Sequence, residues 1–220
     1  MKKLTFGFMA FALAAATLFT SCNKDDDDDD DSSKTSILSA TLSKTESFST
    51  NKCAFYSTSS DTDASTSAFS GLTTLFNSGA STTIAGTANG KTLSLTYLGT
   101  GIESNGKTYT TSVESLKVKN SEATNIIIDL LSGKGLGEIA EDKATDLINK
   151  VTYQALVTYK DVDADAGSDN FYYSTEATIT VEKYLALYIT GTFSATLTNK
   201  SGDKIEITNG KFKAFGKGTL

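Results

Sequence analysis

Hydrophobic and polar residues alternate with a period of two along most of the chain after residue 35. This period is typical of β-strands that bury one face, and short groups of glycine, asparagine, aspartate and serine separate the alternating segments. The pattern predicts nine strands. They cover residues 37–42, 52–56, 93–97, 109–119, 126–131, 152–159, 171–182, 184–197 and 204–212.

One segment follows a helical period instead. Between residues 136 and 151 the apolar residues recur three and four positions apart, with acidic residues early and Lys150 late. Acidic groups near the start of a helix and basic groups near its end both interact favourably with the helix dipole. We predict an amphipathic helix over these residues that covers an open end or face of the sheet.

Three Asn-Gly pairs mark tight turns, because both residue types tolerate a positive φ. The pair at 89–90 precedes the predicted strand 93–97, the pair at 105–106 predicts a type I′ hairpin turn, and the pair at 209–210 predicts a tight turn before the last strand. Residues 61–81 are rich in Ser, Thr, Ala and Gly, and they predict a long loop. This loop carries a small apolar cluster at Leu72, Leu75 and Phe76.

These elements together favour a mainly β fold. Short antiparallel strands joined by turns, with a single helix, are typical of small all-β domains. We therefore expect an antiparallel β-sandwich or a partly open β-barrel, with one amphipathic helix at about residues 136–151.

The first 21 residues predict a secretory signal peptide. Lys2 and Lys3 form a short basic start, residues 4–19 carry no charge, and small residues precede Cys22. The uncharged stretch is shorter than the roughly 20 apolar residues of a membrane span.

The end of this segment, Leu18-Phe19-Thr20-Ser21-Cys22, resembles the bacterial lipobox. The resemblance implies cleavage between Ser21 and Cys22, with a diacylglyceryl group and further acyl chains such as palmitate on Cys22. Phe19 stands where the lipobox usually has leucine, and Leu18 lies one position earlier. Two or more acyl chains anchor a protein stably, because each buried methylene contributes about 0.8 kcal/mol. An ordinary signal peptide with a chance cysteine is the alternative.

Seven consecutive aspartates, residues 25–31, follow Cys22 almost directly. Adjacent like charges repel and bury nothing, so we predict a solvated tether over residues 22–35 and a single β-rich domain over residues 36–220. A plain spacer is one interpretation of the acidic run. The other is a resemblance to the acidic signal that exports lipoproteins of Bacteroidota to the cell surface, carried by Asp25, Asp26, Asp27 and Asp28.

The composition excludes several kinds of chemistry. The sequence contains no His, Arg, Trp or Pro, so it offers no histidine base or metal ligand and no bidentate arginine clamp. Of the 20 basic and 26 acidic residues, three lysines and seven aspartates precede residue 32, which leaves the rest of the chain a net charge of −2. That balance gives no basic surface for nucleic acid. We expect a protein without enzymatic activity; a glycan hydrolase is the alternative, because two carboxylates suffice for that reaction.

Alternating aspartates form the sharpest local motif of the domain. Asp161, Asp163 and Asp165, with Asp169 nearby, could surround one hard cation, so these four residues are a candidate calcium site, and no other cofactor is expected. The motif matches an EF-hand loop only in part, because its glycine comes one position late and Tyr172 stands where the closing glutamate would be. A solvated acidic hairpin tip is the alternative.

Aromatic residues and the second cysteine complete the candidate chemistry. Tyr172 and Tyr173 are candidates for a platform that stacks on a sugar, although aromatic residues in strands also pack in cores or pair across strands. Once Cys22 is lipidated, Cys53 has no disulfide partner, and its alternating surroundings predict a buried thiol.

The C-terminal segments Gly191-Thr192-Phe193-Ser194-Ala195 and Ile207-Thr208-Asn209-Gly210-Lys211-Phe212 resemble the closing hairpin of a family of Bacteroidota lipoproteins without an assigned role. The resemblance covers the chain from Ala177 onwards. It implies a small β-rich domain of the cell envelope and assigns no functional residue. Gly191 fits a bend or bulge.

These features lead to one expectation about function. The chain is expected to be an outer-membrane lipoprotein, anchored through Cys22 and facing the cell exterior, that acts as a binding or structural module. Its expected partners are the membrane, through the lipid, and a glycan or an envelope protein, but not nucleic acid. A periplasm-facing envelope component is a further alternative.

Overall fold

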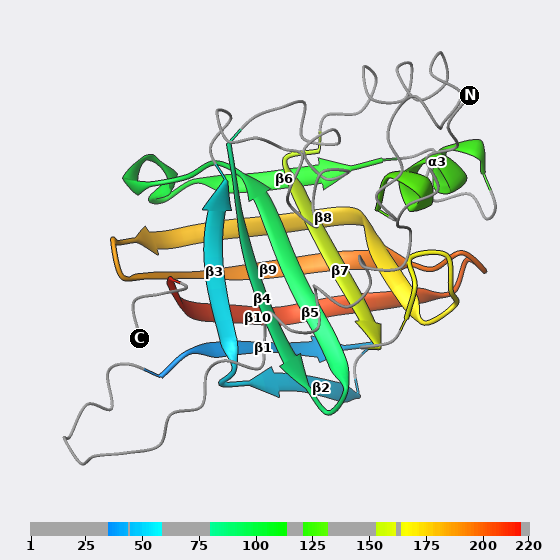
Figure 1. The fold of residues 1–220 in the computed structure, drawn as a ribbon, viewed down its shortest axis with the longest axis horizontal. Coiled ribbons are helices and arrows are strands. Elements are labelled where there is room, and N and C mark those ends of the chain that lie inside the picture. The colour runs from blue at the N-terminus through cyan, green and yellow to red at the C-terminus, as the bar shows by residue number, and fades with distance from the viewer. Residues whose placement is uncertain are drawn as a thin grey trace, which may run out of the picture.

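The computed structural model describes residues 35–43, 45–58, 80–113, 121–131, 153–161 and 164–216. These residues form ten strands, one α-helix and one turn of 3₁₀-helix (Figure 1). The prediction of a mainly β fold is confirmed. Seven of the strands close a mixed β-barrel, and the others extend it.

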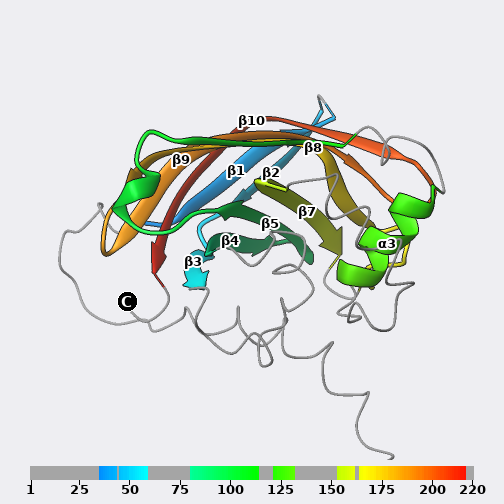
Figure 2. The ribbon, with the colours of Figure 1, turned by 90° about the horizontal axis from the view of Figure 1, so that it is seen from above.

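The strands lie in two layers. The long sheet contains, in spatial order, β6 (Thr108–Ser112), β8 (Phe171–Tyr184), β9 (Tyr188–Thr198), β10 (Lys204–Gly216), β1 (Ile37–Leu42) and β2 (Glu46–Thr50). The short sheet contains β3 (Cys53–Thr58), β4 (Ser81–Ala88), β5 (Lys91–Leu98) and β7 (Ala155–Asp161). Strands of the short sheet run across those of the long sheet (Figure 1), and the long sheet curves over the short one (Figure 2).

Two corners join the layers into a barrel. At one corner, residues 158–160 of β7 pair with residues 171–173 at the start of β8. At the other corner, Phe215 and Gly216 at the end of β10 pair in parallel with Ala54 and Phe55 of β3. This parallel pairing makes the barrel mixed, because its other neighbours are antiparallel.

The two longest strands bend so that they can serve both layers. One edge of β8 pairs first with β7 and then with β6, and one edge of β10 pairs first with β1 and then with β3. The pairing of β10 with β9 shifts register between Ile207 and Gly210, where Asn209 has a φ of 53°. A bulge of this kind bends a strand and increases its twist. The pair at 209–210 is therefore a bulge within β10, and the predicted tight turn there is wrong.

A single hydrophobic core lies between the two layers. It contains side chains from every strand of the closed barrel, and the largest fully buried ones include Leu93, Leu95 and Tyr97 of β5. The ring of Tyr97 stacks on that of Tyr109, with centroids 4.7 Å apart. Burial raises the pKa of Tyr97 above its ordinary value. Cys53 is buried in the same core, as predicted from its surroundings.

The helix α3 (Glu122–Leu131) replaces the strand predicted at residues 126–131, which is wrong. Ser121 caps the helix, since its Oγ accepts a hydrogen bond of 3.0 Å from the backbone N–H of Thr124. Glu122 in the first turn adds favourable charge at the helix N-terminus. Periodicity alone does not distinguish a strand from a buried helix in so short an apolar segment. The cap at Ser121, just before the segment, favours the helix.

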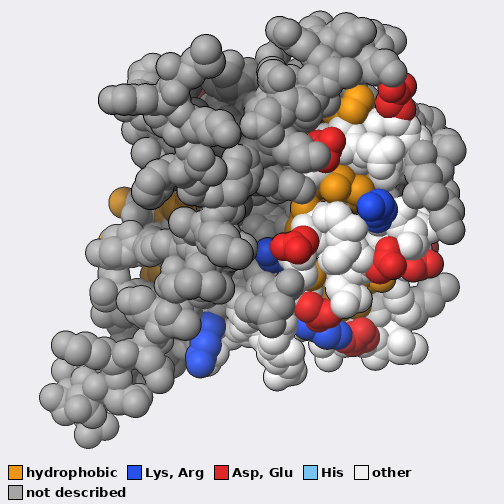
Figure 3. All heavy atoms as spheres, turned by 45° about the vertical axis from the view of Figure 1, so that its right-hand side comes forward, with side chains coloured by type: hydrophobic (Ala, Val, Ile, Leu, Met, Phe, Trp, Pro, Cys, Tyr) orange, Lys and Arg blue, Asp and Glu red, His pale blue; other side chains and the backbone are white. Residues whose placement is uncertain are grey.

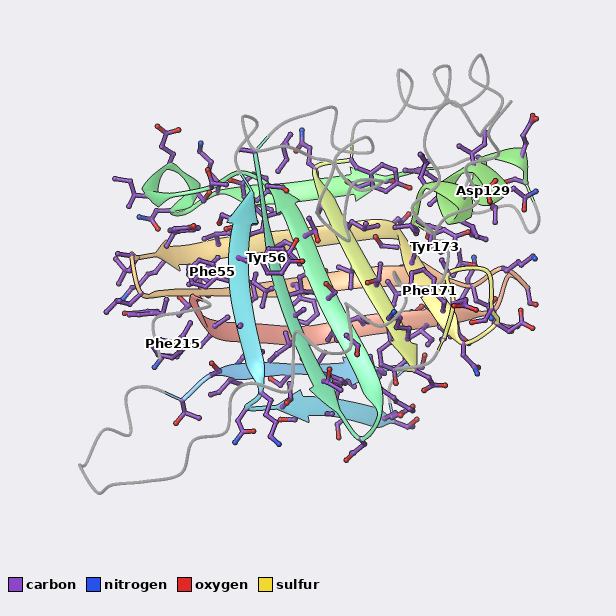
Figure 4. All side chains as sticks on the ribbon, viewed as in Figure 1. Phe55, Tyr56, Asp129, Phe171, Tyr173 and Phe215 are labelled. Carbon is purple, nitrogen blue, oxygen red and sulfur yellow. The ribbon has the colours of Figure 1, made fainter. Side chains whose placement is uncertain are left out.

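The apolar face of α3 packs on the outside of the barrel. Ile127 and Leu130 are buried there against Phe171 and Tyr173 from the start of β8, and against Tyr153. Figure 4 shows Phe171 and Tyr173 beside the helix that carries Asp129. This second cluster covers the corner at which β7 meets β8.

Most of the other predicted strands are found, with shifted ends. The prediction at 37–42 matches β1, the one at 93–97 lies within β5, and the last three correspond to β8, β9 and β10. Strands β2 and β4 lie where the pattern predicts no strand. The predicted helix at 136–151 and the cluster of Leu72, Leu75 and Phe76 lie outside the described residues.

The turn predictions had mixed outcomes. Asn89 and Gly90 have φ values of 51° and 74° and connect β4 to β5 as a tight hairpin turn, as expected. Asn105 has a φ of −58°, whereas a type I′ turn needs a positive φ at this position. The predicted type I′ turn is therefore wrong, and a 3₁₀ turn at Ile102–Ser104 precedes this pair instead.

Two glycines and two phenylalanines interlock where β9 meets β10. Gly191 lies opposite Phe212, and Gly210 lies opposite Phe193. A Cβ atom on Gly191 would lie 2.5 Å from Cζ of Phe212 and even closer to the carbonyl oxygen of Thr180. A Cβ atom on Gly210 would meet the backbone and ring of Phe193 in the same way. Each ring therefore fills the space that a side chain on the facing residue would need.

The substitution Gly191→Ala tests this close contact. We expect it to lower the free energy of unfolding by about 3 kcal/mol, because backbone and ring must move to admit the methyl group. Gly167→Ala is the matched control, since its Cβ would meet only Ile128 at an ordinary 3.9 Å, and we expect a change within about 0.5 kcal/mol. Urea unfolding of both variants measures the difference, and equal effects would show that the interlock does not stabilise the fold.

Candidate functional site

The residues predicted for lipidation, cleavage and export lie outside the described residues. Ser21, Cys22 and the aspartates at 25–28 precede residue 35, where the described chain begins, and β1 starts at Ile37. These sites stay predictions from the sequence. Within the described ranges, no helix has both the length and the apolar character that a membrane crossing requires.

The aspartates of the candidate calcium site follow β7. Asp161 ends that strand, Asp165 and Asp169 are exposed in the turns that lead to β8, and Asp163 lies outside the described residues. Among the residues that the structure describes, no three His, Cys, Asp or Glu side chains are grouped so that they could bind one metal ion. Calcium binding therefore stays a prediction that depends on the position of Asp163.

A buried asparagine connects this loop to the turn between β9 and β10. The Nδ2 of Asn199 donates hydrogen bonds to the backbone oxygen of Asp169 (2.8 Å) and to the carboxylate of Asp203 (3.1 Å). Its Oδ1 accepts a hydrogen bond of 2.8 Å from the backbone N–H of Asp203. The hydroxyl of Ser201 donates to the carboxylate of Asp169. The loop and the turn are thus cross-linked mainly through one side chain.

Together, residues 164–170, the turn at 199–203 and α3 form what we call the charged end of the barrel. Figure 3 shows acidic and basic side chains interspersed on this side of the molecule, with only small hydrophobic areas between them. Partial burial lowers the pKa of Lys160 below its ordinary value, and nearby Asp165 opposes that shift. The mixture of charges is typical of a surface that stays in water.

The two tyrosines of the candidate sugar platform do not lie on one surface. Tyr173 is fully buried in the cluster beneath α3, and burial raises the pKa of its hydroxyl. Tyr172 points the other way, is half-buried, and packs against Tyr159 with ring centroids 6.4 Å apart. Because successive side chains of a strand point to opposite faces, the pair cannot stack together on one ligand.

The opposite end of the barrel carries an apolar surface that the sequence reasoning missed. Among the described residues, the large hydrophobic side chains that are clearly exposed are Ile37 (45%), Ile102 (71%), Leu185 (41%) and Leu187 (57%). We call these four residues the apolar end. Ile37 begins β1, Ile102 begins the 3₁₀ turn between β5 and β6, and both leucines lie in the turn between β8 and β9.

Backbone hydrogen bonds fix the elements of the apolar end. The N–H of Leu185 donates to the oxygen of Tyr188 (2.9 Å), and the N–H of Gly216 donates to the oxygen of Leu187 (3.0 Å). The side chain of Asn105 accepts a hydrogen bond from the N–H of Tyr184, which ties the 3₁₀ segment to the end of β8. The leucines are therefore displayed on an ordered turn.

Aromatic rings and a lysine border this turn. The rings of Tyr188 and Phe215 lie 5.8 Å apart, and the Nζ of Lys213 lies 5.6 Å and 5.5 Å from their centroids. Phe215 is buried, whereas Tyr188 and Lys213 are half-buried, so a tyrosine ring and a cation lie beside the exposed leucines.

A sequence signal for the apolar end exists. Turns usually contain Gly, Asn, Asp or Ser, whereas residues 185–187 are Leu-Ala-Leu between two strands. The period-two pattern places this segment in a predicted strand at 184–197, where leucines are expected to be buried. The exposure becomes visible only once the turn is located.

The fold and its two ends define a closed β-barrel domain with one short helix. A scan against protein-family models matches none, and searches of curated proteins and of solved structures find no significant match. Any assignment of function therefore depends on the residues themselves.

The cross-link at the charged end yields a stability prediction. We expect Asn199→Ala to lower the free energy of unfolding by about 2 kcal/mol, because partly buried backbone groups of the loop and turn lose the hydrogen bonds that Asn199 makes with them. Ser201→Ala removes a contact at the surface, and we expect a loss of about 0.5 kcal/mol or less. Thermal unfolding of both variants measures this difference. An equal, small effect would show that the loop and turn fold independently of Asn199.

Proposed function

We propose that the chain is a lipoprotein precursor in which Cys22 carries the lipid after cleavage behind Ser21. The observation that carries the proposal is the order of segments at the start of the sequence: a basic pair, an uncharged stretch, small residues and then Cys22. That order is typical of a secretory signal, and the cysteine stands where lipobox processing modifies it. Acyl chains on Cys22 would then anchor the domain to a membrane.

The spacing between Cys22 and the barrel supports this proposal. Fourteen residues separate Cys22 from Ile37, the first residue of β1. Seven of these residues are aspartates, which favour a solvated, extended segment. Such a segment spans at most about 50 Å, so the barrel would remain close to the membrane while staying in water.

The proposed location is the outer membrane, with the barrel facing the cell exterior. The acidic run directly behind Cys22 supports export to the surface, as in the Bacteroidota lipoproteins that both ends of the sequence resemble. The barrel acts there as a non-catalytic binding or structural module for a glycan or an envelope protein. The lack of His and Arg in the sequence supports a non-catalytic role.

Replacement of Cys22 tests the anchor. In cells fed a labelled fatty acid, we expect the label on the wild-type protein and none on Cys22→Ala, which is released from the membrane fraction because it has no acyl chains. Cys53→Ala is the matched control and should keep the label, since Cys53 is a buried core residue. Label that persists on Cys22→Ala would contradict the proposal.

Protease treatment of intact cells tests the direction of the barrel. We expect the wild-type protein to be digested, and a variant with asparagine at 25–28 to be lipidated but protected, because its export signal is gone. The matched control carries asparagine at 29–31, farther from Cys22, and should still be digested. Protection of the wild-type protein would instead indicate a periplasm-facing component.

A further inference from the structure

The apolar end and the charged end lie at opposite ends of the same strands. The turn at 185–187 connects β8 to β9 at one end, and the turn at 199–203 connects β9 to β10 at the other. Leu185 and Leu187 lie in the first of these turns, and the other two exposed large hydrophobic residues of the described chain lie on elements near it: Ile102 in the 3₁₀ segment that bonds to Tyr184 of β8, and Ile37 at the start of β1, which pairs with β10. The two ends of the barrel therefore differ in surface character: exposed hydrophobic residues lie at one end and charged residues at the other.

The pairing of the strands brings the tether to the apolar end. Ile37 lies opposite Lys213 of β10, and Lys213 lies opposite Thr190 of β9. Thr190 in turn lies opposite Lys183, two residues before Leu185. The first strand of the barrel thus begins in a row of paired residues that ends at Lys183, next to the turn that carries the exposed leucines.

Charges around the apolar end nearly balance. Lys107, Lys183 and Lys213 lie on the elements that border it, together with Glu103 and Glu182. Neither a strongly acidic nor a strongly basic partner is therefore favoured. Exposed aliphatic side chains flanked by the half-buried Tyr188 and by lysines instead fit the interface of a lipid bilayer, where tyrosine rings and lysine side chains lie at the level of the headgroups.

We propose that the apolar end of the barrel lies against the bilayer that contains the lipid of Cys22. This inference rests on the proposed function, because the lipid keeps the barrel close to that surface. A few exposed side chains bind a membrane weakly on their own, but a short tether makes the contact intramolecular and raises its effective concentration to the millimolar range. The lipid and the apolar end together form a two-point attachment.

The two-point attachment sets the orientation of the barrel. With the leucines of the turn at 185–187 in the interface, residues 164–170, the turn at 199–203 and α3 face away from the membrane. The charged end is then the surface that a partner outside the cell meets first.

The test couples the mature chain, residues 22–220, to phosphatidylcholine vesicles that contain a maleimide lipid. Cys22 is the reactive thiol, because Cys53 is buried. The chemical link replaces cellular lipidation, so a failure to dock is distinguishable from a failure of lipidation, which the Cys22→Ala experiment measures. No native tryptophan interferes, because the sequence contains none.

Leu187→Trp reports on the apolar end and Lys200→Trp, in an exposed turn of the charged end, is the matched control. On the vesicles we expect the Leu187→Trp protein to show a blue shift of its tryptophan emission and quenching by brominated acyl chains. We expect neither change for the Lys200→Trp protein. Equal quenching in both variants, or none in Leu187→Trp, would overturn the proposal.

A second pair of substitutions tests the cause of docking. In the Leu187→Trp background, Ile102→Ser with Leu185→Ser should lower the ratio of docked to undocked barrels by at least about tenfold, because both aliphatic contacts are lost. Both residues are exposed, so the barrel should still fold, which circular dichroism checks. If the Leu187→Trp protein dimerises in solution and the serine substitutions abolish the dimer, a second copy covers the apolar end and the proposal is wrong.

Discussion

The contact between β9 and β10 is the constraint on which the rest of the barrel depends. Gly191 and Gly210 leave space that the rings of Phe212 and Phe193 fill from the facing strand, and the two rings lie 6.5 Å apart. Only glycine permits so close an approach, so the two pairs fix the register of these strands, as aromatic residues facing glycines do in other sheets. Strands β6 and β7 attach to β8 on one side of this pair, and β1 and β3 attach to β10 on the other. An error of register in this hairpin would therefore misplace both corners of the barrel.

The bulge in β10 explains how one strand serves both layers. Ile207 and Phe212 both point into the core, although they are five positions apart and would face opposite sides of a regular strand. The extra residue at Asn209 changes the alternation, so that Gly210, Phe212 and Ala214 follow Ile207 to the inner face. The same irregularity bends the strand towards β3, which allows the parallel pairing that closes the barrel.

Sequence patterns predicted the class of fold and most strands because one face of each strand is buried, and burial imposes the period of two. The patterns failed where contacts between residues far apart in the sequence determine the local structure. Residues 126–131 are apolar except for Asp129, and they continue a helix that begins at the Ser121 cap. The eight residues of β4 include polar side chains that are nevertheless buried, such as Thr82, so no alternation was visible. The candidate tyrosines were separated because adjacent residues face opposite ways, and the apolar end became visible only with the position of the turn at 185–187.

The topology also explains why the start of β1 and the exposed leucines lie at the same end. Strands β8, β9 and β10 are consecutive and antiparallel, so the turn between β8 and β9 lies at the end where β10 finishes. Strand β1 is antiparallel to β10, so it must begin at that end as well. The barrel interior is occupied by side chains from every strand, which leaves the outer surface and the ends for contacts with other molecules. Because the order of the strands alone places the start of β1 beside that turn, docking through its hydrophobic residues, as proposed above, would orient the whole barrel.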